Sequence, residues 1–245
     1  MTGTTPQGAR SEQEAANWVR AMFGRVAPRY DLANHILSFN LDRYWRARTV
    51  ASVWDVLARH DARVLDICCG TGDLVRALQR ARPPGMPVMG SDFCHPMLLS
   101  AREKLMNRRR TADLFEADAL HLPLPEASLD LITVAFGFRN LANYEAGLRE
   151  MRRVLRNGGV AAILEFSQPP NALFGALYRF YSRRILPLVG GTLSGSRDAY
   201  AYLPESVRKF PGPEELAEMM RAAGLGAVEF ERFTGGIVTL HVGRV

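Results

Sequence analysis

A glycine-rich turn between a short apolar run and a helical pattern constrains the fold of this chain more than any other feature. Residues 63–78 read RVLDICCGTGDLVRAL, with an apolar run ending at Gly70 and apolar residues at helical spacing after it. An apolar run, a glycine turn and an amphipathic pattern in this order predict a strand followed by a helix. In an α/β sheet, such a turn is where a ligand approaches the backbone.

Strands and helices alternate along the remaining sequence. We expect five further elements in the middle of the chain, namely strands at 87–93, 113–120 and 129–136 and helices at 96–108 and 144–155. The turn Asn157-Gly158-Gly159 is expected to end the second of these helices, before a buried strand at 160–166. A helix at 211–223 precedes strands at 228–233 and 237–243 that can pair antiparallel. This alternation predicts an α/β fold with a doubly wound, mostly parallel sheet and an antiparallel C-terminal strand.

Two regions lie outside the alternation and favour a lid. Residues 16–60 have a helical pattern, and residues 169–210 form an insertion before the last helix. Both regions can cover the carboxyl ends of the strands, where doubly wound sheets bind ligands. We therefore expect a loose N-terminal tail over residues 1–15 and one domain over 16–245, with these two regions as its lid.

Acidic residues stand where successive strands are expected to end. Asp66 precedes Gly70 and Gly72, Asp92 ends the second strand, and Asp118 follows the third. Two carboxylates near the turn, Asp66 and Asp73, would repel a pyrophosphate, and the turn lacks the G-x-G-x-x-G spacing of dinucleotide sites. These residues suit a ligand with a cationic amino group and a sulfonium, whose ribose hydroxyls Asp92 can bind.

Longer motifs show a resemblance to one enzyme family. They read MFGRVAPRYDLANHILSFNLDRYWR, VLDICCGTGDL, SDFCHPML, AFGFRNL, LREMRRVL, LEFSQP, YLPESVRKFP and FTGGIVTLHVG. Over roughly residues 20–243 the chain resembles the quinone-biosynthesis C-methyltransferases, which are class I methyltransferases with a Rossmann-like fold that use S-adenosyl-L-methionine. The resemblance implies C-methylation of a prenylated quinol, with demethylmenaquinol as the favoured substrate. The alternative substrate is a 2-methoxy-6-polyprenyl-benzoquinol of ubiquinone synthesis.

The resemblance implies a set of cofactor contacts. It carries over to Thr71, Asp92, Asp118 and Ala119, and Phe93 is expected to flank the adenine. Some members of the family have serine where this chain has Ala135, so a contact there would involve backbone or packing. The full predicted cofactor set is Asp66, Gly70, Thr71, Gly72, Asp92, Phe93, Asp118, Ala119 and Ala135.

Methylation of a quinol carbon requires a phenolate or a base that generates one. Arg139 and Asn140 follow the central strand and are expected at the rim of the active site, where arginine can stabilise a phenolate or orient a water molecule. His35 is a candidate base, although a structural role for it is equally open. The predicted substrate-binding residues are Tyr30, Asp31, Asn34, Tyr200 and Arg208. Asp31 and His35, at positions i and i+4, would share one face of a helix.

Charge and composition bear on the partners. The chain has 31 Lys and Arg against 25 Asp and Glu, a net charge of +6, but its basic residues lack the interleaved aromatic stripe of nucleic-acid proteins. Residues 173–189 mix large apolar side chains with Arg179, Arg183 and Arg184. This segment favours either a core-packing helix or a lid that receives an isoprenoid tail and makes transient contact with the membrane surface.

The remaining expectations concern location and alternative classes. The absence of a signal-like start, and cysteines limited to Cys68, Cys69 and Cys94, favour a cytoplasmic protein without a metal, peripheral to the inner face of the membrane. A homodimer is left open. A nucleic-acid methyltransferase and a noncatalytic subunit that binds S-adenosyl-L-methionine are the competing classes, and we expect no nucleic-acid partner.

Overall fold

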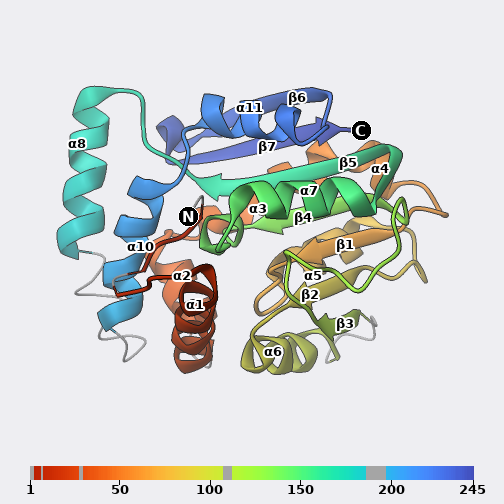
Figure 1. Ribbon diagram of the computed structural model, residues 1–245, viewed down its shortest axis with the longest axis horizontal. Helices are drawn as coiled ribbons and strands as arrows, with labels where there is room; N and C mark the ends of the chain where they lie inside the picture. Colours follow the sequence, from red (N-terminus) through yellow and green to blue (C-terminus); the bar gives the residue numbers. More distant parts are fainter. Residues whose placement is uncertain (1–2, 7, 28–29, 107–111, 186–196) are drawn as a thin grey trace.

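One seven-stranded sheet organises the chain. The computed structural model describes residues 3–6, 8–27, 30–106, 112–185 and 197–245 (Figure 1). The strand order is β3-β2-β1-β4-β5-β7-β6, and β7 runs opposite to the other six strands. The strands are β1 Val64–Ile67, β2 Met89–Asp92, β3 Asp113–Glu116, β4 Leu129–Ala135, β5 Leu155–Phe166, β6 Ala227–Phe233 and β7 Val238–Arg244. The predicted mostly parallel sheet with an antiparallel C-terminal strand is confirmed.

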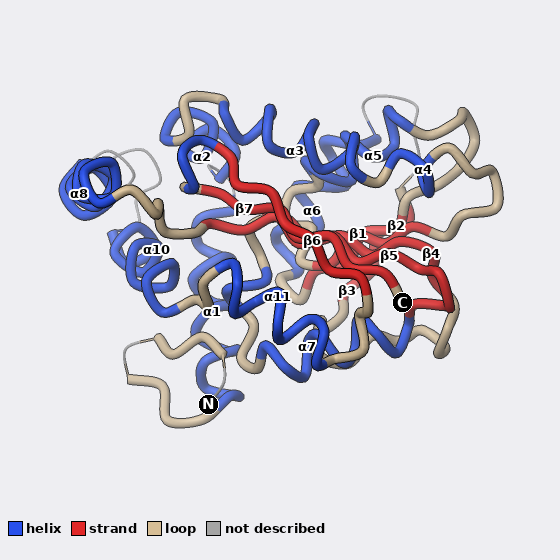
Figure 2. The backbone as a smooth tube through the Cα atoms, turned by 90° about the horizontal axis from the view of Figure 1, so that it is seen from above, coloured by secondary structure: helices blue, strands red, loops and turns tan. Residues whose placement is uncertain are grey.

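Helices cover both faces of the sheet (Figure 2). On one face, α7 and α11 contribute Leu148, Met151, Leu216 and Met220 to a core with β4 and β5. On the other face, α3, α4, α5 and α6 pack through Trp45, Leu57, Leu78 and Leu98. The helices are α1 Glu12–Val26, α2 Tyr30–Leu37, α3 Leu41–Ser52, α4 Trp54–Leu57, α5 Asp73–Ala81, α6 His95–Met106, α7 Tyr144–Val154, α8 Ala172–Phe180, α10 Arg197–Lys209 and α11 Pro213–Ala222. Among the described residues, the short helical segments are η2 Phe138–Asn140, η3 Tyr181–Ile185 and η4 Thr234–Gly236.

The glycine turn joins β1 to α5 as predicted. Gly70 and Gly72 have φ angles of 54° and 82°, which residues with a Cβ adopt only under strain. Gly72 caps the N-terminus of α5, and Leu74, Val75 and Leu78 bury one face of that helix. The turn therefore brings the backbone close to the carboxyl end of β1, where a ligand can reach it.

The expected end of the helix at 144–155 is corrected by the structure. Helix α7 ends at Val154, and β5 begins at once with Leu155, so the Asn157-Gly158-Gly159 segment lies inside the strand. Pairing with β4 jumps from Leu129–Leu155 to Leu131–Val160, which makes this segment a bulge. The glycines shape the entry into the strand and do not terminate the helix.

Described residues within the expected loose tail over residues 1–15 contact the rest of the domain. Helix α1 begins at Glu12, where Ser11 accepts a hydrogen bond from the backbone of Glu14. Thr4 is 3% exposed, its amide donates to the carbonyl of Leu141, and its hydroxyl lies 2.6 Å from that of Tyr202. Thr4 thus pairs both its amide and its hydroxyl with partners elsewhere in the domain. Within the described ranges, no helix combines the length and apolar character needed to cross a bilayer.

Candidate active site

Two cavities meet beyond the carboxyl ends of the central strands. The first contains the carboxylates of Asp66, Asp73, Asp92 and Asp118 and is called the polar cavity. The second, called the apolar cavity, has a volume of about 570 Å³ and is enclosed by residues of α1, α2, α3, α8 and α10. Their shared wall consists of Phe23, Tyr30, Arg46 and Phe136. A reacting atom in one cavity thus lies beside the contents of the other.

The polar cavity brings together the residues that follow neighbouring strands. All of the predicted cofactor residues except Gly72 line it. Gly72 lies behind the turn, where an added Cβ would be 3.2 Å from Leu105 and 3.3 Å from Ala101. Gly72 therefore does not line the cavity, and it acts by shaping the turn that presents Gly70 and Thr71 to it.

Asp66 and Asp92 are buried carboxylates in this cavity. Asp66 accepts a hydrogen bond from Thr133 Oγ1 at 2.6 Å, and burial raises its pKa to about 7. Asp92 accepts from the amides of Gly70 and Cys94, each at 2.8 Å, and burial raises its pKa to about 6. Buried acids with raised pKa values favour a cationic ligand, because its charge restores the ionised carboxylates.

The turn residue Thr71 is held by the lid. Its hydroxyl donates to the carboxylate of Asp31 on α2, and Lys104 Nζ donates to it at 3.1 Å. Asp31 also pairs with Lys104. Asp31, predicted to bind substrate, thus attaches α2 to the turn and lines neither cavity.

Asp118 is exposed at the edge of the polar cavity and caps its own turn. Its carboxylate accepts from the amide of Leu120 at 2.9 Å. This cap uses one oxygen of the carboxylate, so the carboxylate can also accept a hydrogen bond from a ligand. The turn-capping role and the predicted adenine contact are therefore compatible.

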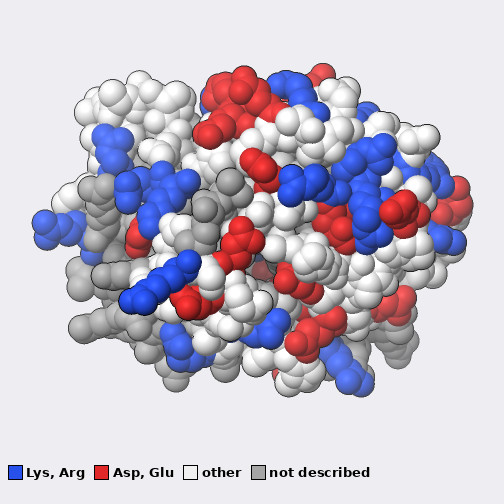
Figure 3. Space-filling model, in the orientation of Figure 1, with Lys and Arg blue, Asp and Glu red and all other residues white. Residues whose placement is uncertain are grey.

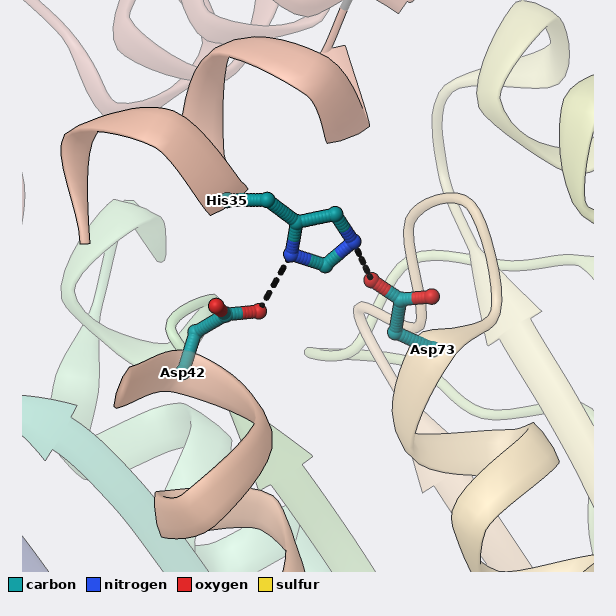
Figure 4. A group of neighbouring side chains, drawn as sticks. All are labelled: His35, Asp42 and Asp73. Atoms are coloured by element: carbon teal, nitrogen blue, oxygen red, sulfur yellow. Dashed lines mark hydrogen bonds and ion pairs between the residues drawn. The ribbon is translucent and has the colours of Figure 1, made fainter. Parts of the chain in front are cut away.

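His35 joins three elements at the lid (Figure 4). Its Nδ1 lies 2.8 Å from Asp42 Oδ2 on α3, and its Nε2 lies 3.8 Å from Asp73 Oδ2 on α5. Histidine and the two carboxylates offer ligand atoms within 4.8 Å of one another, as a metal site would. Arg46 also contacts both carboxylates, and Lys104 contacts Asp73 at 2.9 Å. These cations favour an ion-paired junction over a bound metal.

The position of His35 disfavours it as the base. It lines neither cavity, because the face of α2 that it shares with Asp31 packs against α5 and α6. The geometry instead supports the structural alternative for this residue.

The apolar cavity holds most of the predicted substrate residues. Tyr30, Asn34 and Arg208 line it, while the side chain of Tyr200 lies outside the described residues. Burial raises the pKa of Tyr30, although Arg139 and Arg46 oppose the shift. An aromatic group of Trp45, Phe136 and Phe166 forms part of the wall. This wall suits a flat ring with apolar substituents.

Arg139 and Asn140 are buried, not at the rim. Arg139 is 5% exposed and lines the apolar cavity, with its guanidinium carbon 5.3 Å from the ring centre of Phe166. Asn140 lines the polar cavity, and its Oδ1 accepts from the hydroxyl of Tyr202 at 3.0 Å. Consecutive residues of η2 thus line the two cavities, one residue each, and this corrects the expected position at the rim.

Two residues at this site, Arg46 and Glu165, are not among those predicted from the sequence. Arg46 lines both cavities and pairs with Asp42, and Glu165 is 2% exposed and pairs with Arg139 at 2.8 Å. One signal for Glu165 was present, because an acid within the apolar run VAAILEF is expensive to bury without a partner. The only local signal for Arg46 was its i, i+4 spacing from Asp42.

Comparisons with known proteins identify relatives over nearly the whole chain. A family model described as the ubiE/COQ5 methyltransferase family matches residues 9–245. A demethylmenaquinone methyltransferase from Thermus thermophilus is 49% identical over 91% of this chain and 99% of its own length. The one from Deinococcus radiodurans is 45% identical over 99% of both chains. A ubiquinone/menaquinone biosynthesis C-methyltransferase from Geobacter sulfurreducens is 40% identical over 94% of this chain and 89% of its own.

Solved structures of lower sequence identity share the fold. A SAM-dependent methyltransferase from Thermotoga maritima has a TM-score of 0.63 at 18% identity and covers 91% of this chain and 98% of its own. The cyclase SpnF has a TM-score of 0.68 at 17% identity over 98% of both chains. A cyclase among these neighbours shows that the fold alone does not determine the reaction.

Proposed function

This chain belongs to the ubiE/COQ5 methyltransferase family, and from that membership we propose that it methylates a ring carbon of demethylmenaquinol to give menaquinol. The observation that carries the proposal is the junction of a carboxylate-lined cavity with a larger aromatic one at Tyr30, Arg46 and Phe136. Relatives at 49% and 45% identity that are named demethylmenaquinone methyltransferases support this substrate.

The polar cavity fits S-adenosyl-L-methionine. The buried carboxylates of Asp66 and Asp92 suit its cationic amino group and ribose hydroxyls, and the glycine turn admits close approach of the backbone. S-adenosyl-L-methionine supplies an electrophilic methyl group on a sulfonium. The protein has to align this group with the ring and to stabilise negative charge on the quinol oxygen.

Different residues of the two cavities would perform these two tasks. Tyr30 and Phe136 line both cavities, so they border the place where the quinol ring and the methyl group would come into direct contact. Arg139 places a buried positive charge in the wall of the substrate cavity, where it stabilises a phenolate. In the balanced reaction, a ring C–H becomes C–CH3, the C–S bond breaks to leave a neutral thioether, and one proton is released.

Methyl transfer to reduced demethylmenaquinone tests the proposal. We expect labelled methyl on the ring with the wild type and at least a 100-fold loss with Arg139→Ala, a usual effect of removing a group that stabilises transition-state charge. Arg149→Ala, on the exposed side of α7, is the matched control and should retain activity. Binding of S-adenosyl-L-methionine without transfer to any quinol would instead indicate a noncatalytic subunit.

A second candidate substrate is the 2-methoxy-6-polyprenyl-benzoquinol of ubiquinone synthesis. Relatives at 40–42% identity carry a name that includes both pathways. The same assay with both quinols decides between one substrate and two. On the face shown in Figure 3, acidic and basic side chains intermingle, which does not favour a nucleic-acid substrate.

The mouth of the apolar cavity supports transient contact with a membrane. Phe39, Leu177 and Phe180 line the cavity and are also exposed, Phe39 at 73%. Leu173, one turn before Leu177 on α8, is 83% exposed, and α8 carries one charged residue, Arg179, in its last turn. A prenylated quinol resides in the bilayer, so this apolar lip would let its ring enter while the protein rests on the inner membrane face from the cytoplasm.

Vesicle binding tests this contact. Leu173→Glu should reduce co-sedimentation with vesicles that contain anionic lipid, because it places a charge where the lip meets the acyl chains. Leu99→Glu, an equivalent change at a 53% exposed residue of α6, is the control. Equal binding by both variants would contradict the proposed orientation. Light scattering would measure whether the protein forms the homodimer that the sequence leaves open.

A further inference from the structure

A buried acid behind the substrate cavity holds Arg139 by both its backbone and its side chain. Glu165 lies near the end of β5, the strand next to β4, and is 2% exposed. Its Oε1 accepts from Arg139 Nη1 at 2.8 Å and from the amide of Phe166 at 2.7 Å. Its Oε2 accepts from the amide of Arg139 at 3.1 Å. One carboxylate therefore fixes the position of η2 and the orientation of the guanidinium on it.

The held guanidinium keeps one buried donor free. Arg139 Nη1 also donates to the carbonyl of Phe136. Arg139 Nε is buried and finds no acceptor among the residues that the structure describes. Nε itself has no surface open to the apolar cavity, so a ligand there would meet the charge of Arg139 through other atoms of its side chain.

The pair also keeps Arg139 charged. Burial by itself would lower the pKa of the guanidinium, but the adjacent Glu165 carboxylate raises it above its usual value. A permanently protonated arginine cannot accept the phenol proton, but it can stabilise the negative oxygen that remains after the proton has left.

We propose that Glu165 is a positioning residue for the methyl transfer, which holds Arg139 as a cation in the wall of the cavity that would bind the quinol. This inference rests on the proposed function. Glu165 contacts Arg139 and backbone groups and lines neither cavity, so it acts through Arg139 and not on the substrate.

A second glutamate–arginine pair provides a matched control. On α7, Glu150 accepts from Arg153 Nη2 at 2.7 Å, from Arg153 Nε at 2.8 Å and from the amide of Leu122 at 2.6 Å. This arrangement resembles that of Glu165, since an arginine side chain and backbone donate to the same carboxylate, with one amide on Glu150 and two on Glu165. Neither Glu150 nor Arg153 lines a cavity. Glu150→Gln thus removes a comparable pair without touching the active site.

A double-mutant cycle tests the proposal in the methyl-transfer assay. Glu165→Gln should lower kcat by about 10- to 100-fold, since misplacing a catalytic group by ~1 Å costs on the order of 100-fold. The Kd for S-adenosyl-L-methionine should stay within about twofold, because the polar cavity is unchanged. In the Arg139→Ala background, Glu165→Gln should cause no further loss of kcat, since the group it positions is gone. Glu150→Gln should leave kcat unchanged.

Chemical rescue supplies a readout that a purely structural role would not move. Guanidinium ion at a non-denaturing concentration should restore part of the activity of Arg139→Ala, because Glu165 can bind the free cation in the vacated space. The Arg139→Ala/Glu165→Gln protein should not respond. If Glu165→Gln fails to fold, Glu165→Asp keeps the charge but shortens the reach, and it should lower kcat less than Arg139→Ala does.

The outcomes separate this proposal from the one on which it rests. Additive losses in the cycle, or equal rescue with and without Glu165, would overturn the positioning role while leaving the methyltransferase activity established. Absence of methyl transfer by the wild-type protein to either quinol would overturn both.

Discussion

Lowering the pH should weaken the binding of S-adenosyl-L-methionine through two identified carboxylates. The pKa values of Asp66 and Asp92 are raised by burial to about 7 and about 6. Without ligand, each carboxyl takes up a proton as the pH falls through its own pKa. A cationic ligand favours the ionised forms, so the affinity is greatest above about pH 7 and declines as the pH falls.

The size of the effect follows from the two pKa values. At about pH 5, about 10% of Asp92 and about 1% of Asp66 are ionised in the free protein. Binding that requires an ionised Asp92 is then about tenfold weaker, and binding that requires an ionised Asp66 is about 100-fold weaker. Each tenfold step corresponds to about 1.4 kcal/mol of binding free energy.

Isothermal titration calorimetry between about pH 8 and pH 5 measures this dependence. Asp66→Asn and Asp92→Asn should each bind more weakly at the higher pH, and each should lose its own part of the pH dependence. Asp113→Asn, an exposed acid on β3, is the control and should follow the wild type. The reasoning is refuted if the wild-type Kd changes by less than about twofold over this range, or if both variants keep the wild-type slope.

Three further predictions concern stability, each measured by urea unfolding. Phe138→Ala should lower the free energy of unfolding by about 3–5 kcal/mol, because the ring is fully buried against Tyr144 and Phe210, and a loss below about 1 kcal/mol would contradict this packing. Burial lowers the pKa of His241 from 6.5 to about 4. As the pH falls, this histidine is therefore protonated in the unfolded chain before it is protonated in the folded protein. The free energy of unfolding of the wild type should fall between about pH 6.5 and pH 4, by up to about 3 kcal/mol. His241→Gln should remove that part of the pH dependence, and identical profiles of variant and wild type would rule it out. Gly72→Ala should lower the free energy of unfolding more than Gly85→Ala does. Both glycines have a positive φ, but only a Cβ at residue 72 would contact Leu105 and Ala101. Equal losses of stability would show that the φ angle alone matters.

The sheet and the polar cavity could be predicted because both depend on local patterns. Apolar runs mark the strands, and parallel strands place their carboxyl ends at one edge, so acids that follow successive strands meet there. Asp66 and Asp92 needed no further information. The bulge at Asn157-Gly158-Gly159 could not be predicted, because a glycine pair after a helical pattern is equally typical of a helix end.

The lid contacts depend on tertiary packing that leaves no local pattern. The i, i+4 spacing of Asp31 and His35 correctly predicts a shared helix face, but it does not say against which element that face packs. In the structure the face meets Thr71, Asp73 and Lys104, which removes both residues from the cavities. Arg46 reaches both cavities only because α3 packs beside α5.

The position of β5 in the sheet also sets the order in which the chain can complete its active site during synthesis. One edge of β5 pairs with β4, which the ribosome has already made, and the other pairs with β7, where Thr239 lies opposite Glu165. Residues 167–237 must be translated in between, which takes roughly 4 to 14 seconds at ~5–20 residues per second. For that interval the apolar strand that anchors Arg139 has an unpaired edge, the kind of surface that promotes association with other chains. Until β7 emerges, this edge of β5 is open to other chains, and a chaperone that shields it would act on the strand whose Glu165 pairs with Arg139.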